Sequence, residues 1–434
     1  MKLWQKNKQE QDRLVEKFTV GNDQHFDLLL ARYDVLGSLA HTTMLAKVGL
    51  LTPEELSQIH QSLQEIKNDI EAGDFVIAAG VEDIHSQVEL LLTQKIGEAG
   101  KKIHSGRSRN DQVAVDIKLY LKDEMRNIKD ACATLFHVLI GLSTRHQDVL
   151  MPGLTHFQLA MPSSFGLWFS AYAESLSEDL ELLHAAYSMA DRNPLGSGAG
   201  YGSSFPLDRT ETTTLLGFSR MHYNAINAQM SRGKTEKYTA IGIAAIGATL
   251  ARLSMDICLY MNQNFGFVSF PDTLTTGSSI MPHKKNPDIF ELVRAKCNTL
   301  QAVPNELALL MNNLPSGYHR DMQLTKEIIF PAIEKIKDCL QILIYALPQI
   351  QVRQDILADD RYQQVFTVET VSELVLQGMP FRDAYKVVGE QVEQGVFRYE
   401  RFHISRHTHE GSMGNLCNEA IVQQFAAVLS RFEA

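Results

Sequence analysis

Residues 111–150 read DQVAVDIKLYLKDEMRNIKDACATLFHVLIGLSTRHQDVL and contain no proline. Apolar side chains recur through this stretch at spacings of three and four: Val113, Ile117, Leu121, Met125, Ile128, Cys132, Leu135, Leu139 and Leu142. That spacing places them on one face of an α-helix. A helix of about forty residues would be about 60 Å long, which is unusual within a compact domain and typical of a helical bundle.

Other long helical patterns accompany this one. A second proline-free run extends from Leu207 to Phe270, and its centre, Tyr238–Met261, is apolar on nearly every side, as expected of a helix inside a bundle. Further helices are predicted at Ser164–Arg192, Pro287–Asn312 and Ile328–Leu347, and few segments alternate as strands do. The pattern predicts a mainly α fold.

The segments on either side of the long helices are made of shorter helical patterns. A chain of 434 residues is too long for one ordinary hydrophobic core. We expect an N-terminal helical domain over residues 1–106, a central long-helix bundle over 107–352 and a small C-terminal helical domain over 353–434. The broad apolar faces of the bundle exceed what one chain can bury, which favours an oligomer.

Composition excludes several classes of protein. Apolar residues make up 44% and charged residues 21%, the mix of a folded soluble protein. The net charge of −10 identifies no partner, and the absence of a basic stripe with interleaved aromatics argues against nucleic acid. No uncharged apolar stretch of eighteen residues predicts a membrane span, and the polar N-terminus argues against a secretory signal.

The five cysteines are scattered and form no CxxC pair: Cys132, Cys258, Cys297, Cys339 and Cys417. They indicate free thiols in a reducing cytoplasm rather than a disulfide framework or a zinc site. Paired-histidine metal spacing is also missing, so no metal is expected.

Two glycine-containing segments are poor nucleotide motifs. Leu195–Pro206, LGSGAGYGSSFP, fails G-x-G-x-x-G at every offset, and Arg232–Thr235, RGKT, has Ala228 where a P-loop needs its first glycine. There is no G-x-S-x-G nucleophile elbow either.

Three other segments combine residue types that a core would not select. Thr275–Asp288, TTGSSIMPHKKNPD, joins a mobile glycine–serine strip to two lysines and an asparagine just before a predicted helix, although a solvated loop is the alternative. His104–Asp116, HSGRSRNDQVAVD, brings two arginines to a helix start, where backbone N–H groups attract a carboxylate. Met151–Met161, MPGLTHFQLAM, places Thr155 and His156 at a turn between two helices, and a lone histidine there is either structural or an acid–base group.

Taken together, these segments resemble the fumarase/aspartase superfamily. Gly277–Pro287, GSSIMPHKKNP, is similar to that superfamily's signature loop, GSSxMPxKxNP. Within the superfamily, HSGRSRNDQ (104–112), MPGLTHFQ (151–158), GYHRDMQLTKE (317–327) and GMPFRDAYKVVG (378–389) resemble the argininosuccinate lyase family. The resemblance covers about Leu36 to Gly389. It implies a three-domain helical fold and a homotetramer with a twenty-helix core, in which three subunits build each active site.

The resemblance also implies a reaction: β-elimination of argininosuccinate to arginine and fumarate, without a cofactor. The doubly charged aci-carboxylate formed by loss of the carbon-bound proton needs cations and N–H donors. Matching positions imply Ser278 as the base, Lys284 and Asn286 as carbanion stabilisers, and His156, oriented by Glu291, on the acid side. Which of Ser278 and His156 takes the carbon proton stays open. The matching binding positions are His85, Ser108, Arg109, Asn110, Thr155, Tyr318, Gln323 and Lys326.

The chain departs from the family at two places. Asn22 or Asp23 stands where the family has a substrate-binding serine, and Met230–Gly233 keeps only the arginine of S-D-R-D. Because both places should contact the arginine half of the substrate, an α-N-acylated argininosuccinate or another succinylated amine is the alternative substrate. Another superfamily lyase and a non-catalytic structural relative are the remaining alternatives. The retention of Ser278, His156 and Lys284 speaks against the latter.

Overall fold

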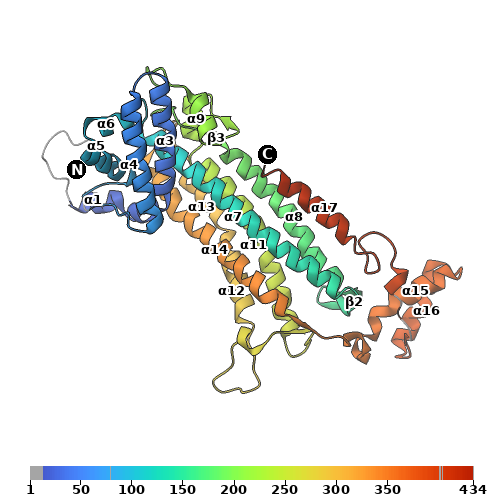
Figure 1. The fold of residues 1–434 in the computed structure, drawn as a ribbon. Helices are drawn as coiled ribbons and strands as arrows, with labels where there is room; N and C mark the ends of the chain where they lie inside the picture. The colour runs from blue at the N-terminus through green and yellow to red at the C-terminus, as the bar shows by residue number, and fades with distance from the viewer. Residues whose placement is uncertain (1–12, 79, 400–401, 403, 434) are drawn as a thin grey trace. The chain divides into compact units, whose positions relative to one another are not determined.

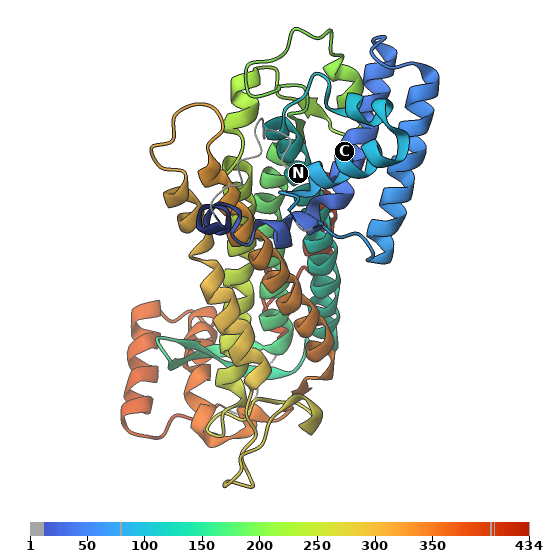
Figure 2. The same cartoon turned by 90° about the vertical axis from the view of Figure 1, so that its left-hand side faces the viewer.

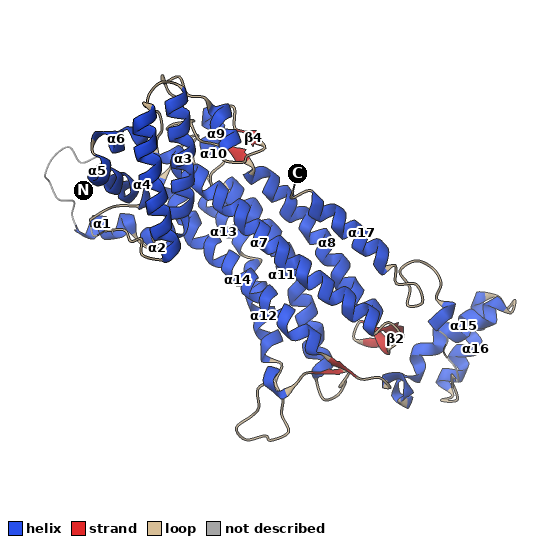
Figure 3. Cartoon of the chain, viewed as in Figure 1, coloured by secondary structure: helices blue, strands red, loops and turns tan. Residues whose placement is uncertain are grey.

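A computed structural model describes residues 13–433 except Ala79, Glu400, Arg401 and His403. Helices dominate the described chain, and the strands are short (Figure 3). The prediction of a mainly α fold is confirmed. The described chain forms two compact units. Unit 1 takes the described residues of Met1–Ile128, Leu182–Ala245 and Thr299–Ile336, and unit 2 takes those of Lys129–Glu181, Ile246–Asn298 and Lys337–Ala434. The three-domain division stays a prediction.

Shorter elements interrupt the predicted run Leu207–Phe270, and the long helices lie within or close to the predicted runs. They are α7 (Arg109–Arg145), α8 (Phe165–Ala190), α11 (Lys234–Met261), α12 (Asp288–Leu300) and α14 (Thr325–Ala346). Each of them has residues in both units. The helix predicted over residues 111–150 ends at Arg145, because the chain enters strand β1 at Leu150.

One predicted helix proved to be two. The run Pro287–Asn312 divides into α12 and α13 (Val303–Leu310). Pro304 lies in the first turn of α13. Its ring lacks an N–H and clashes with the carbonyl four residues earlier, at Leu300, where α12 ends. The prediction of one continuous helix here was therefore wrong.

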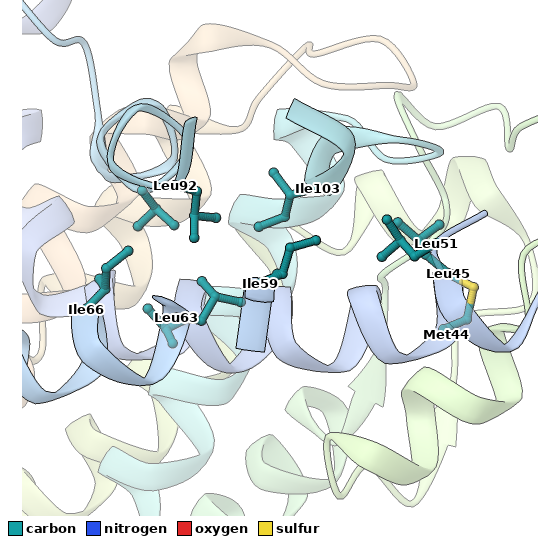
Figure 4. Packing of buried hydrophobic residues seen from close by; sticks show 10 residues of the cluster. Met44, Leu45, Leu51, Ile59, Leu63, Ile66, Leu92 and Ile103 are labelled. Carbon is teal, nitrogen blue, oxygen red and sulfur yellow. The ribbon is translucent and has the colours of Figure 1, made fainter. Parts of the chain in front are cut away.

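Unit 1 contains an antiparallel core of short helices. Helices α3 (Ala31–Lys47) and α4 (Pro53–Ala72) lie side by side, with α5 (Ile84–Ile96) packed against both (Figure 1). Ile59, Leu63 and Ile66 are fully buried or nearly so, and their spacing of four and three residues gives α4 one apolar face. Figure 4 shows this face directed towards Leu92 of α5.

Both ends of α4 are specified by sequence. The Thr52 hydroxyl accepts from the Glu55 N–H at 3.2 Å, while Glu55 accepts from the Thr52 N–H at 3.0 Å. This reciprocal pair is a capping box, and Pro53 occupies the first helical turn beside it. Gly73 ends the helix with a φ of 80°, a conformation that glycine adopts without a Cβ clash.

The remaining helices and strands are short. The helices are α1 (Arg13–Val20), α2 (Asp23–Asp27), α6 (Glu98–Lys101), α9 (Arg209–Leu215), α10 (Ala225–Met230), α15 (Thr367–Leu376), α16 (Phe381–Glu393) and α17 (Asn418–Ser430). In unit 2, α15 packs on α16, the orange pair of Figure 2. The sheets are β1–β2 (Leu150–Thr155, Gln158–Ser164), β3–β4 (Arg192–Asn193, Arg220–Met221) and β5–β6 (Val268–Ser269, Gln351–Val352), and only β3–β4 is parallel.

One helical stretch, Ala225–Met261, is long and apolar enough to cross a bilayer by length and composition, with a mean hydropathy of 1.5. More than half of its most apolar window is buried inside the protein. Thr235, Glu236 and Thr239 are also buried on this stretch. It is a core helix, as its all-round apolar pattern predicted. All five cysteines lie in the described chain and are free thiols.

Candidate active site

Unit 1 contains a charged cavity of about 280 Å³. Its lining includes six predicted site residues: His85, Arg109, Asn110, Tyr318, Gln323 and Lys326. The other lining residues are Val20, Asp23, Asp27, Glu82, Asp83, Val113, Arg232 and Arg320. Carboxylates and cations thus face one another in one small space, which suits a ligand that carries charges of both signs.

The first turn of α7 fixes one wall of the charged cavity. The Ser108 hydroxyl accepts from the Asn110 N–H at 3.3 Å, and the Ser108 N–H donates to Asp111 at 2.8 Å. The Arg109 guanidinium lies 3.2 Å from Glu82 and 3.0 Å from Asp83. These carboxylates hold Arg109 against the cavity wall. Arg107 does not line the cavity, so the two arginines of the segment do not meet at one place.

Asp111 shows what the glycine-rich segment does. Its second carboxylate oxygen accepts from the N–H groups of Gly196 and Gly198, at 2.9 and 2.8 Å. Leu195–Pro206 therefore folds around a carboxylate of α7, and its glycines serve a tight backbone turn. The exclusion of a nucleotide motif there agrees with this structural role.

His85 lines the charged cavity and is paired with buried carboxylates. Its Nδ1 is 2.8 Å from Asp34 and 3.7 Å from Asp116, and all three side chains are buried. Burial opposes the charged imidazole, but these carboxylates outweigh it and raise the pKa of His85 to about 9. The nearby His85 charge also lowers the pKa of Asp34 against the effect of burial.

Asp34, His85 and Asp116 are residue types that can ligate metals, and their ligand atoms all lie within 4.8 Å of one another. The sequence did not reveal this group, because Asp34 and His85 are 51 positions apart. The 2.8 Å contact between them is a charge-assisted hydrogen bond. We therefore interpret the group as an ion-pair cluster that supports the cavity.

The segment 317–327 closes another wall and ties it to the N-terminal helices. Gln323 donates from Nε2 to the carbonyl oxygens of Thr19 and Val20, at 3.1 and 3.3 Å. The Lys326 ammonium contacts Asp27 at 2.5 Å and Asp23 at 2.6 Å. The sequence pattern marked Asp23 only as a departure from the family and did not identify Asp27 as a site residue. Their spacing of four residues, which puts both on one face of α2, was the available signal.

The remaining predicted site residues belong to unit 2. Strands β1 and β2 form a hairpin in which Thr155 pairs with Gln158, so His156 and Phe157 form a two-residue turn. Both have positive φ, 55° and 59°, as a type I′ turn requires. The turn exposes the Thr155 and His156 side chains. Among the described residues of a single chain, no ion pair joins His156 to Glu291, and both side chains are exposed.

The signature loop Gly277–Pro287 is closed at its base by backbone pairing of Thr276 with Asn286. The Ser278 hydroxyl accepts from the N–H groups of Ile280 and Met281, at 3.4 and 3.2 Å. Lys284 is exposed on the same loop. The loop thus carries Ser278, Lys284 and Asn286 together, while their catalytic roles stay predictions.

Known proteins resemble the chain along its whole length. The Lyase family profile matches residues 5–301. Argininosuccinate lyase of Bacteroides thetaiotaomicron is 56% identical over 431 residues, covering 99% of this chain and 96% of the relative. Argininosuccinate lyase of Thermotoga neapolitana is 42% identical over 390 residues, covering 90% and 98%.

Two solved structures share the fold. EDDS lyase in complex with formate superposes with a TM-score of 0.78 at 20% identity, covering 96% of this chain and 90% of that one. Class II fumarase from Schistosoma mansoni gives 0.73 at 15% identity, covering 96% and 94%. These likenesses concern the fold alone, because both identities lie below 25%. The chain belongs to the argininosuccinate lyases, carbon–nitrogen lyases of the fumarase/aspartase superfamily.

Proposed function

We propose that this chain cleaves argininosuccinate to arginine and fumarate, in the cytoplasm, as a step of arginine biosynthesis. The observation that supports the proposal most strongly is that one chain contains both the groups needed for elimination and the groups needed to bind the substrate. The signature loop supplies a serine, a lysine and an amide, and the charged cavity supplies cations beside carboxylates. Argininosuccinate joins a dicarboxylate to a zwitterionic amino acid, so its cleavage requires both the loop and the cavity.

The elimination divides into two proton movements. A base, Ser278 or His156, removes the proton from the carbon beside a carboxylate, and the electrons move onto that carboxylate as an aci-carboxylate. Lys284 and Asn286 stabilise this charge where it develops. The carbon–nitrogen bond then breaks, its electron pair stays on the guanidino nitrogen, and the acid side protonates that nitrogen. A serine base requires nearby cations and exclusion of water to become active.

Two groups of residues bind the two halves of the substrate. Thr155, Ser108, Arg109 and Asn110 hold the carboxylates of the fumarate half, while Tyr318, Gln323, Lys326 and His85 bind the rest of the substrate. Glu291 orients His156. Neither cofactor nor metal takes part in this scheme.

We also propose a homotetramer with a twenty-helix core, in which three subunits complete each site. Two observations support it. The binding residues of unit 1 share one cavity, whereas His156, Lys284 and Glu291 are exposed on a single chain. Exposed catalytic groups in water would be poorly activated, and burial by neighbouring subunits would correct this.

Replacing Ser278 by alanine tests the proposal. Turnover of argininosuccinate, followed by the ultraviolet absorbance of fumarate, should fall by about 10²–10⁴-fold, the loss expected for a general base. Ser279→Ala on the same loop is the matched control and should lose far less. Near-normal turnover in Ser278→Ala would remove this residue from the role.

A further inference from the structure

Two carboxylates of α2 share one cation in the charged cavity. Asp23 and Asp27 lie one helical turn apart, and the Lys326 ammonium contacts both, at 2.6 and 2.5 Å. The Asp27 side chain is almost fully buried, whereas 18% of the Asp23 side chain stays exposed and lines the cavity. Asp23 is therefore the carboxylate of this pair that a ligand can reach.

Within this group of three side chains, negative charge exceeds positive charge. Lys326 contributes one positive charge against two negative ones. Burial raises the pKa of Asp23 to about 6 against the lowering effect of Lys326, so the carboxylate is mostly ionised at neutral pH. Asp23 thus brings to the cavity wall a negative charge that can pair with a cationic group of a ligand.

An unfilled donor lies in the same cavity. Arg232 is 3% exposed and lines the cavity, and its Nη1 has no hydrogen-bond partner among the described residues. Its other nitrogens are held in place: Nε donates to Glu236 and Nη2 to the Met322 carbonyl oxygen, each at 3.2 Å. Arg232 and Asp23 also interact electrostatically. One cavity thus offers both a carboxylate and a guanidinium, which complement the α-ammonium and the α-carboxylate of an amino acid.

We infer that Asp23 is a specificity-determining residue that binds the free α-ammonium of the substrate's arginine half, while Arg232 binds the α-carboxylate. This inference rests on the proposed function. The departure at Asp23 then indicates plain argininosuccinate rather than an α-N-acylated form. Acylation turns the ammonium into a neutral amide, which leaves the buried carboxylate without its partner.

The test compares argininosuccinate with its α-N-acetyl form, each as a substrate of the full-length enzyme in the fumarate assay. The native enzyme should prefer the free amine by on the order of 10²-fold in kcat/KM, the scale of losing one buried charge pair. In Asp23→Asn and Asp23→Ser this preference should fall by on the order of tenfold, mainly through KM of the free-amine substrate. Asp23→Glu should retain part of the preference.

Asp74→Ser is the matched control, since Asp74 is an exposed aspartate outside the cavity. It should keep the native preference. An equal preference in Asp23→Asn and the native enzyme would overturn the inference, as would a native preference for the acetylated substrate.

Calorimetry with L-arginine and N-acetyl-L-arginine separates this inference from the proposed function, because it needs no turnover. L-Arginine should bind more tightly than its acetyl form, and Asp23→Asn should remove most of the difference. If no fumarate is released from either substrate, the proposed function fails, while the calorimetric difference still decides the role of Asp23. Equal binding of the two arginines would refute that role.

Discussion

Gly233 shows how a departure from the family pattern is accommodated at one residue. Its φ is +72°, and a Cβ added there would lie 1.9 Å from the sulfur of Met311. A larger side chain at this position would clash with that methionine. Gly233 therefore leaves the neighbouring Arg232 in place while Met311 fills the space.

Gly233→Ala should lower the free energy of unfolding by about 1–3 kcal/mol, because alanine in the left-handed region is strained and the Met311 side chain must move. A lowered melting temperature in scanning calorimetry measures this. Gly141→Ala is the control: Gly141 lies within α7, has no atom near its added Cβ, and should be neutral or stabilising. Equal melting temperatures for Gly233→Ala and the native protein would contradict the prediction.

His85 makes stability depend on pH with a definite sign. Its pKa rises from 6.5 to about 9 on folding, since Asp34, Asp83 and Asp116 outweigh the effect of burial. The folded state thus favours the proton, and the stabilisation is complete below pH 6.5 and lost as the pH rises through about 9. Melting temperatures of the native protein should fall across this window more steeply than those of His85→Asn. If the melting temperatures of the native protein and of His85→Asn fall equally with pH, then folding does not raise the pKa of His85.

At the scale of elements, the sequence predicted where single helices lie, but it did not predict which elements contact one another. The spacing of apolar residues predicted α7, α8, α11 and α14 to within a few residues. The hairpin turn at His156 and Phe157 was seen only as a turn, because neither residue signals positive φ as strongly as glycine does. The contacts of Asp111 with Gly196 and Gly198 join positions 85 and 87 apart, which no local pattern specifies.

The capping box of α4 gives a test of local specification. Thr52→Ala should cost about 1 kcal/mol, because the Glu55 N–H loses its acceptor at the helix start. Thr52→Ser retains the hydroxyl and should stay within a few tenths of a kcal/mol of the native protein. Thermal melting of the two variants side by side measures the difference. A Thr52→Ser variant as unstable as Thr52→Ala would show that packing, and not the cap, matters here.

For the whole molecule, the sequence predicted six of the residues that line the cavity but little of its electrostatics. Six of the predicted residues share one cavity because His85 and the quoted motifs 104–112 and 317–327 converge in unit 1. The pairing of Lys326 with Asp23 and Asp27 depends on tertiary packing across about three hundred positions.

The proposed sharing of sites among subunits predicts complementation. Ser278→Ala and Lys326→Met should each be nearly inactive, and coexpressing them should restore a fraction of activity, because some sites in the mixed tetramer draw both groups from unmutated copies. Lys326→Met with Asn110→Ala is the control pair: both residues line one cavity of a single chain, so no activity should return. Activity in neither mixture would indicate that each copy contains its own complete site.

The most direct test of the central claim is a product balance for the native enzyme supplied with argininosuccinate and no added metal or cofactor. We predict equimolar fumarate and arginine, measured by ultraviolet absorbance and amino-acid analysis, with nothing else formed. Absence of fumarate, or fumarate released without arginine, would contradict the account.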